Sequence, residues 1–266
     1  MPPKIESKIM ALFCDFENIA LGVRDADTAQ FDISKVLERL LLKGNIVVKK
    51  AYCDWARYKA FKAAMHEASF ELIEIPHVRQ SGKNSADIRM VVDALDLCYT
   101  KEHVDTFVII SGDSDFSPLV SKLRENNKTV IGVGVKNSTS DLLTANCDEF
   151  IFYDDLIERK RPQKKSSRPK IKPTKPLLLS DEKKQKAWEL IVETYDALLE
   201  ERGEEEKIWG SMIKQTLKRR KPGFSESHYG YRSFGELLKE AEEVGILEME
   251  RDEKSGGYII IKTHAS

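Results

Sequence analysis

The chain has 266 residues, of which 41% are hydrophobic, and a formal net charge of -1. This length allows a sizeable core and favours two domains, and no apolar run approaches the roughly 18 residues that cross a bilayer. The first residues, MPPKIESKIM, lack the apolar core of a signal peptide, and the four cysteines form no CxxC or Cys/His cluster for zinc. We therefore expect a reduced, cytoplasmic protein with no membrane partner.

Strand-like and helix-like runs alternate along the N-terminal part of the chain. Apolar runs predict strands at 8–14, 45–52, 70–75, 106–110, 129–135 and 149–153. Helical periodicity predicts helices at 32–43, 56–68, 85–100 and 117–127. Such alternation is typical of an α/β fold, with a parallel sheet and helices on both faces. In these sheets ligands bind outside the carboxyl ends of the strands.

A basic segment separates two acidic parts. Residues 159–186 hold 12 Lys and Arg against 2 Asp and Glu, whereas 1–158 hold 19 against 25 and 187–266 hold 12 against 17. Three prolines and no acid occur between 159 and 175, so this stretch cannot pack into a core, and we assign 159–184 as a linker. It is a solvated spacer, a strip that binds phosphates, or both.

The C-terminal part, 185–266, contains three amphipathic runs and two short strand candidates. Helices are predicted at 186–201, 209–220 and 233–245, and strands at 246–251 and 256–262. Three helices and a β-hairpin in this order predict a small winged helix-turn-helix domain.

Aspartates stand where predicted strands end. Asp15 follows the first strand in CDFENIA, with Asn18 three residues further on, and Asp113 and Asp115 follow the fourth strand in SGDSDF. If the first and fourth strands are neighbours, these side chains emerge at one edge of the sheet. The simpler alternative for a DxD motif is a turn or a helix N-cap, and Asp115 is the candidate for a cap.

Asp87 opens the helix predicted at 85–100. At about 100° per residue it lies in the middle of an apolar arc, formed by Ile88, Met90, Val91, Val92, Ala94, Leu95, Leu97, Cys98 and Tyr99. A first-turn carboxylate favours the helix dipole behind a Ser85 cap, but the dipole does not require an inward direction. We therefore expect Asp87 to be a ligand, and Asp93 and Asp96 to be solvated.

Clustered carboxylates repel one another. At about 4 Å and an effective dielectric near 20 the cost is about 4 kcal/mol, so such groups either take up a proton or hold a cation. Aspartate and asparagine oxygens, with no His or Cys nearby in the motifs, suit Mg²⁺ or Mn²⁺. The acidic motifs therefore predict a divalent metal site.

These motifs resemble the NYN domain, the LabA-like branch of the PIN nuclease superfamily. The resemblance rests on CDFENI, SADIRMVVDAL and VIISGDSDFSPLVSKLRENNKTVIGVGV, and assigns 1–158 to this domain. It implies a PIN-like Rossmannoid fold and a metal-dependent ribonuclease whose catalytic and metal-binding residues are Asp15, Asp87, Asp113 and Asp115. Residues that would support them or contact phosphate are Asn18, Ser111 and Lys83. The approach SGKNSAD differs from the Gly-Val that often precedes the helix acid.

The C-terminal part resembles the OST-HTH or LOTUS domain in PGF, YGYRSF and ELLKEAEEVGIL. This resemblance implies a winged helix that binds RNA or docks a protein. The basic and aromatic residues available for RNA are Lys214, Lys218, Arg219, Arg220, Lys221, Tyr229, Tyr231 and Arg232. A basic cluster at a helix end also complements the dipole, and aromatic residues of a small domain often form its core. We expect one of the two tyrosines to be exposed.

These features favour hydrolysis of single-stranded RNA, with Mg²⁺ or Mn²⁺ as cofactor and RNA affinity supplied by the linker and the C-terminal module. One alternative is a non-catalytic RNA-binding regulator with a vestigial acidic site. Another is a Rossmann-like phosphatase, in which Glu17 would be the second acid after Asp15, although the DxxN pattern and SGDSDF weigh against it. A homodimer and a protein partner of the LOTUS-like module are both compatible with the sequence.

Overall fold

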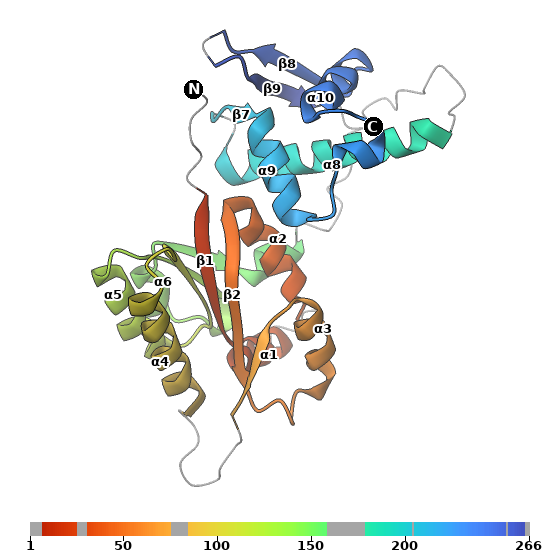
Figure 1. Ribbon diagram of the computed structural model, residues 1–266. Coiled ribbons are helices and arrows are strands. Elements are labelled where there is room, and N and C mark those ends of the chain that lie inside the picture. The colour runs from red at the N-terminus through yellow and green to blue at the C-terminus, as the bar shows by residue number, and fades with distance from the viewer. Residues whose placement is uncertain are drawn as a thin grey trace. The chain divides into compact units, whose positions relative to one another are not determined.

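The computed structural model describes residues 7–25, 31–75, 85–158, 179–203, 205–253 and 255–263. The described residues belong to two compact units, 7–158 and 179–263 (Figure 1). The first helix of the second unit begins at Leu179, ahead of the predicted linker end at 184. No helix within these ranges is both long and apolar enough to cross a membrane.

The first unit is built on a six-stranded parallel sheet. Its strands are β1 (Lys8–Asp15), β2 (Gly44–Cys53), β3 (Glu71–Glu74), β4 (Thr106–Ile110), β5 (Thr129–Gly134) and β6 (Glu149–Phe152). Their order is β3-β2-β1-β4-β5-β6, which confirms the predicted parallel α/β sheet. Because Cys14 of β1 is in register with Ile110 of β4, Asp15 and Ser111 stand at neighbouring strand ends.

Helices cover both faces of this sheet (Figure 1). One face packs against α1 (Phe16–Asp25), α2 (Ile33–Lys43), α3 (Lys62–Glu67) and α7 (Tyr153–Glu158). The other packs against α4 (Ser85–Thr100), α5 (Ser117–Glu125) and α6 (Asp141–Asn146). Short 3-10 turns precede α3, α5 and α6; they are η1 (Lys59–Phe61), η2 (Ser114–Phe116) and η3 (Lys136–Ser138).

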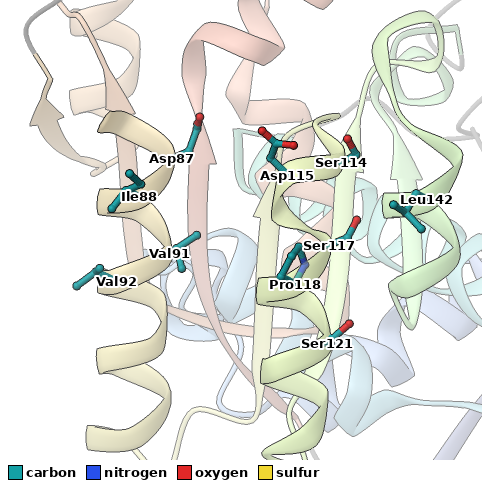
Figure 2. Close-up of a pocket in the computed structure, with 10 residues that line it drawn as sticks. All are labelled: Asp87, Ile88, Val91, Val92, Ser114, Asp115, Ser117, Pro118, Ser121 and Leu142. Atoms are coloured by element: carbon teal, nitrogen blue, oxygen red, sulfur yellow. The ribbon is translucent and has the colours of Figure 1, made fainter. Parts of the chain in front are cut away.

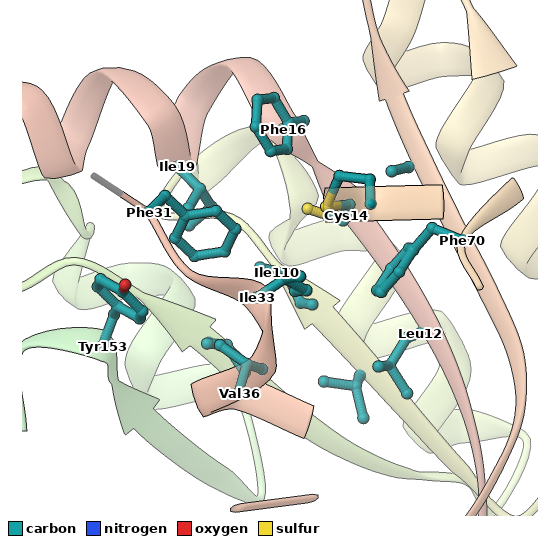
Figure 3. Close-up of a cluster of buried hydrophobic side chains, with 14 of the residues drawn as sticks. Leu12, Cys14, Phe16, Ile19, Phe31, Ile33, Val36, Phe70, Ile110 and Tyr153 are labelled. Carbon is teal, nitrogen blue, oxygen red and sulfur yellow. The ribbon is translucent and has the colours of Figure 1, made fainter. Parts of the chain in front are cut away.

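The side chains of β1 alternate between two cores, as a strand period of two requires. Leu12 and Cys14 belong to the cluster under α1 and α2, whereas Ala11 and Phe13 belong to the cluster under α4 and α5. Figure 3 shows the first cluster, in which Phe16 of α1 packs beside residues of several other elements. With both faces buried, β1 is a rigid support for the residue at its end.

Local capping explains where several helices begin. Asp32 accepts a hydrogen bond from the backbone N–H of Ser34 at 3.0 Å and caps α2, and Ser140 accepts one from Leu142 at 3.2 Å and caps α6. α1 was not predicted, because it follows β1 without an intervening loop. The helix predicted at 56–68 is shorter, and consists of η1 followed by α3.

The predicted apolar arc of α4 is only partly buried. Met90, Ala94 and Cys98 form the buried row, at intervals of four residues, whereas Ile88 and Val92 are 62% and 55% exposed. A helix that lies on a sheet buries one stripe of its surface, and the arc read from the sequence was wider than that stripe. The apolar arc therefore faces the core only in part, and Ile88 and Val92 are left on the surface.

The second unit combines helices with a three-stranded antiparallel sheet of order β7-β9-β8. Its elements are α8 (Leu179–Arg202), β7 (Ile208–Trp209), α9 (Gly210–Arg220), η4 (Glu226–Tyr229), α10 (Phe234–Glu243), β8 (Leu247–Arg251) and β9 (Tyr258–Thr263). Ile191, Ile213, Leu237 and Ile260 are among the buried residues of its core. Its classification as a winged helix stays a prediction.

Candidate active site

Asp15, the last residue of β1, is 8% exposed and held by two donors. Its Oδ2 accepts a hydrogen bond from the Ser111 hydroxyl at 3.1 Å, and its Oδ1 accepts one from the backbone N–H of Asn18 at 3.3 Å. Ser111 follows β4 directly, and Asn18 lies in the first turn of α1. The carboxylate is therefore fixed between the ends of two central strands and a helix start.

The loop after β4 is organised by its own side chains. The Ser111 hydroxyl accepts a hydrogen bond from the N–H of Asp113 at 3.2 Å, and Oδ1 of Asp113 accepts one from the N–H of Asp115 at 2.9 Å. Asp113 thus caps η2, whereas Phe116 stands at the N-cap of α5. The sequence interpretation of Asp115 as a helix cap was wrong, because the 3-10 turn starts at Ser114, three residues before α5, and Asp115 lies inside that turn.

Gly112 ties this loop to the segment after β5. Its N–H donates to Oδ1 of Asn18 at 2.8 Å, and its carbonyl accepts from the N–H of Ser140 at 2.9 Å. A Cβ at this position would lie 2.9 Å from Cα of Thr139 and still closer to the backbone oxygen of Ser138. A side chain cannot be accommodated without moving the backbone, so glycine is required here by close approach.

The predicted acids influence one another's ionisation. Burial, then the charge of Asp87, raises the pKa of Asp15 to about 7, and Asp113 adds to the effect. Burial, then the charges of Asp113 and Asp115, raises the pKa of Asp87 to about 6. Figure 2 shows Asp87 and Asp115 on the neighbouring elements α4 and η2. Residues that are far apart in the sequence therefore share one acidic site.

The donor chemistry of this site suits a hard cation. Its side chains offer carboxylate oxygens, and their mutual repulsion would be relieved by a positive ion. Within the described ranges, however, no three His, Cys, Asp or Glu side chains converge closely enough to hold a metal ion together. The residues that could bind one are Asp15, Asp87, Asp113 and Asp115. Lys83, the predicted phosphate contact, lies outside the described residues.

Glu17 is an additional acid of the site. Its charge contributes to the raised pKa of Asp87, and its carboxylate forms an ion pair with Arg57 at 3.0 Å. From the sequence, Glu17 is a candidate only for the second acid of a phosphatase, although its place two residues after Asp15 is a signal that it belongs to the site. The Arg57 ion pair ties the start of α1 to the segment after β2.

Asp93 is not solvated, contrary to the expectation from periodicity. It accepts a hydrogen bond from the Tyr52 hydroxyl at 2.8 Å and lies 3.3 Å from Nζ of Lys50 and 3.0 Å from Nε of Arg89. Although burial opposes the change, these partners lower the pKa of Asp93. Its role is to join α4 to β2. Asp96 is exposed, as predicted.

The predicted RNA contacts of the second unit differ in availability. Lys214 forms an ion pair with Glu226 at 2.7 Å, and Arg219 is half-buried and donates to the Thr216 hydroxyl at 2.9 Å. Lys218, Lys221 and Arg232 are exposed, and Arg220 is partly exposed. The end of α9 therefore presents a smaller basic surface than the sequence suggested.

The two tyrosines also differ. Tyr231 is buried in the core, where Nζ of Lys184 lies 5.3 Å from its ring centre. Its assignment as an RNA contact was wrong, because a buried ring cannot stack on a base. Tyr229 is partly exposed and stacks on Phe224 with ring centres 5.4 Å apart.

The acidic site lies within a recognisable family domain, since residues 9–156 match the model of the NYN domain. The chain belongs to the NYN family. NYN domains are part of the PIN-like nuclease superfamily, so the family indicates a nuclease-type hydrolase. The predicted NYN assignment is confirmed, and Asp15, Asp87, Asp113 and Asp115 all lie inside the matched range.

Two similar proteins extend the comparison of the NYN unit. An uncharacterized protein of Methanocaldococcus jannaschii is 28% identical over 141 residues, which are 50% of this chain and 55% of that protein. The match thus spans about half the length of each. The crystal structure of a Vibrio parahaemolyticus protein of unknown function is 27% identical, with a TM-score of 0.50, and the match covers 56% of this chain and 95% of that one.

Proposed function

We propose that this protein is a metal-dependent ribonuclease that hydrolyses phosphodiester bonds of single-stranded RNA. The observation that carries the proposal is the coupling among Asp15 at the end of β1, Asp87 on α4 and Asp113 in the loop after β4. A fold gains no stability from buried like charges, and such perturbed groups concentrate at functional sites. The NYN match supports a nuclease-type reaction.

In this proposal Asp15, Asp87 and Asp113 hold Mg²⁺ or Mn²⁺, and Asp115 completes the site or orients the attacking water. When bound, such an ion lowers the pKa of water and stabilises the leaving oxygen. Ser111 and Asn18 keep the Asp15 carboxylate in place through the hydrogen bonds they donate to it. They would act as positioning residues.

RNA affinity would come from outside the NYN unit. Residues 1–158 hold 19 Lys and Arg against 25 Asp and Glu, so this part repels a polyanion. The linker 159–184 and the exposed cations at the end of α9 would supply phosphate contacts in a LOTUS-like, winged-helix module. A fragment of residues 1–158 should then bind RNA much more weakly than the full chain.

The test is cleavage of end-labelled single-stranded RNA by the purified full chain with Mg²⁺ or Mn²⁺. Asp15→Asn and Asp113→Asn should each lower the rate at least ~100-fold, because each removes a carboxylate that would hold the metal ion. Asp96→Asn is the matched control, since Asp96 is an exposed aspartate of α4. Cleavage that survives both site substitutions would refute the proposal.

A non-catalytic RNA-binding regulator is the second candidate. The observation that favours it is that the acids do not converge into a three-donor cluster in the part of the chain that the structure describes. It predicts RNA binding that resists both site substitutions, together with no metal-stimulated cleavage by the unaltered chain. The same assay therefore separates the two functions.

A further inference from the structure

A groove adjoins the acidic site on the surface formed by α4, η2, α5 and α6 (Figure 2). Asp87 and Asp115 line one end of it. Beyond them the lining is largely apolar and includes Ile88, Val92 and Pro118. Its volume of about 730 Å³ falls in the range of pockets that hold a small ligand.

The apolar lining is unusually open to water. Ile88, Val92 and Leu142 are 62%, 55% and 57% exposed, and they come from two different helices. Apolar side chains gathered around a groove mark binding sites more often than single exposed ones do. The described residues that line this groove include no lysine or arginine, so they offer no ion pair to a phosphate.

Ser117 provides an independent indication of a ligand. It lines the groove at the start of α5 and is only 7% exposed. Its hydroxyl oxygen is buried and has no hydrogen-bond partner among the described residues. A buried polar group without a partner is uncommon in folded proteins and requires an explanation.

We propose that this groove binds a nucleobase of the RNA, next to the phosphate that is cut. The base would pack against Ile88, Val92 and Pro118, and the Ser117 hydroxyl would form a hydrogen bond to its edge. A nucleotide joins an anionic phosphate to a flat, largely apolar base, and the site follows the same order, from the carboxylates that bind metal to the apolar wall. This inference rests on the proposed ribonuclease function.

The first test is the kinetics of the full chain carrying Val92→Ser. Val92 is exposed, and serine has a similar helix propensity, so folding is preserved. Loss of the apolar contact should raise KM about 5- to 10-fold with little change in kcat, as expected for base stacking. Val47→Ser is the matched control, because Val47 is 50% exposed on β2 and outside the groove. It should leave KM unchanged.

A second test uses two abasic RNAs, each of which lacks one of the two bases next to the phosphate that is cut. The unaltered chain should lose about the same factor in kcat/KM on one of these abasic substrates as Val92→Ser loses on normal RNA. Combining variant and abasic substrate should add no further loss, because both remove the same contact. Independent, multiplied losses would place the base elsewhere and overturn the inference.

Photo-crosslinking tests the groove without requiring turnover. RNA that contains 4-thiouridine, mixed with full-length Asp113→Asn protein, should crosslink to peptides of α4 and α5, and Val92→Ser should weaken these crosslinks. Absent crosslinks together with an unchanged KM would overturn the base site while leaving the nuclease function intact. Cleavage that persists in both Asp15→Asn and Asp113→Asn would instead refute the nuclease function. If light scattering shows that Val92→Ser changes the oligomeric state, the groove is an interface between copies, and the inference fails.

Discussion

The acidic site of the NYN unit and an ion pair of the second unit arrange their charges in opposite ways. In the NYN unit, burial and the charge of Asp87 raise the pKa of Asp15 to about 7, and burial and the charges of Asp113 and Asp115 raise the pKa of Asp87 to about 6. In the second unit Glu226 forms an ion pair with Lys214, whose hydrogen bond lowers the pKa of Glu226 although burial opposes the change. The Lys214–Glu226 pair stabilises the fold of the second unit, whereas the acidic site of the NYN unit keeps like charges together at the expense of stability. That difference is the physical basis for placing the chemistry in the NYN unit.

The largest expected effect concerns the stability of β1 as pH changes. The pKa of Asp15 rises from 3.8 to about 7 on folding, so the folded state retains a proton that the unfolded state loses. Stability therefore falls as pH rises through this window, by about 4 kcal/mol at most. Asp15→Asn should remove this loss and protect the NYN unit at pH 8 in metal-free buffer.

Hydrogen exchange followed by mass spectrometry measures this effect in peptides of β1 and β4 and leaves the second unit out of the comparison. The unaltered chain should be better protected at pH 5 than at pH 8 after correction for the intrinsic exchange rate. Asp15→Asn should be nearly independent of pH, and Asp96→Asn should behave like the unaltered chain. Weaker protection of Asp15→Asn at pH 8 would contradict the assignment of a destabilising charge.

Gly112→Ala should have the next largest effect. The new Cβ meets the backbone of 138–139, and the resulting shift of the loop should cost about 1–3 kcal/mol. Misplacement of Asp113 should lower cleavage at least tenfold. Gly235→Ala in α10 is the matched control, because its Cβ has room. It should not lower stability, measured by urea unfolding, because alanine favours the helix more than glycine does, and it should leave cleavage unchanged. An equal loss of stability in both variants would contradict the role of close packing at Gly112.

Lys214→Ala tests the ion pair of the second unit. It leaves the mostly buried Glu226 without its partner and should cost about 1 kcal/mol near neutral pH. Because the folded pKa of Glu226 is lowered, this contribution is present above the unfolded pKa and is lost as pH falls. Thermal unfolding of Lys214→Ala, Glu226→Gln and the double variant should show a coupling that disappears in acid. A coupling free energy between Lys214 and Glu226 that increases in acid would contradict this prediction, because the ion pair would then depend on pH in the same direction as Asp15 does.

Lys218→Ala should have the smallest effect on stability, within about 0.5 kcal/mol, because Lys218 is exposed. It should weaken RNA binding and reduce the slope of log affinity against log salt by about 1. Fluorescence anisotropy at several salt concentrations measures this slope. Lys214→Ala should change it less, since the charge of Lys214 is already compensated by Glu226. If Lys218→Ala and Lys214→Ala change the slope equally, an ion pair within the protein does not determine which lysines contact RNA.

The strands of the NYN unit were largely predictable because their apolar runs are long and bounded by turns. The adjacency of β1 and β4 was the most important part of this prediction for the site, because their pairing places Asp15 beside Ser111. Short elements were not predictable. α6 and α7 have six residues each, which is too few for a helical period to stand out.

The finer structure of the site depended on partners that sequence patterns do not show. Periodicity placed Asp93 in solvent, yet Tyr52 and Lys50 of β2 approach it from the sheet. The cap formed by Asp113 depends on a 3-10 turn that has no period of its own. Tyr231 is buried because its unit is small and needs aromatic residues for its core.

The parallel direction of all six strands has a practical consequence. Every carboxyl end lies at the edge that carries Asp15 and Asp113, so the segments that enter the strands lie at the opposite edge. The turn at 101–105, which leads into β4, is therefore remote from the acids. A fluorophore or a surface tether attached at His103 would therefore allow the proposed RNA cleavage to be followed on single molecules without obstructing the acidic site.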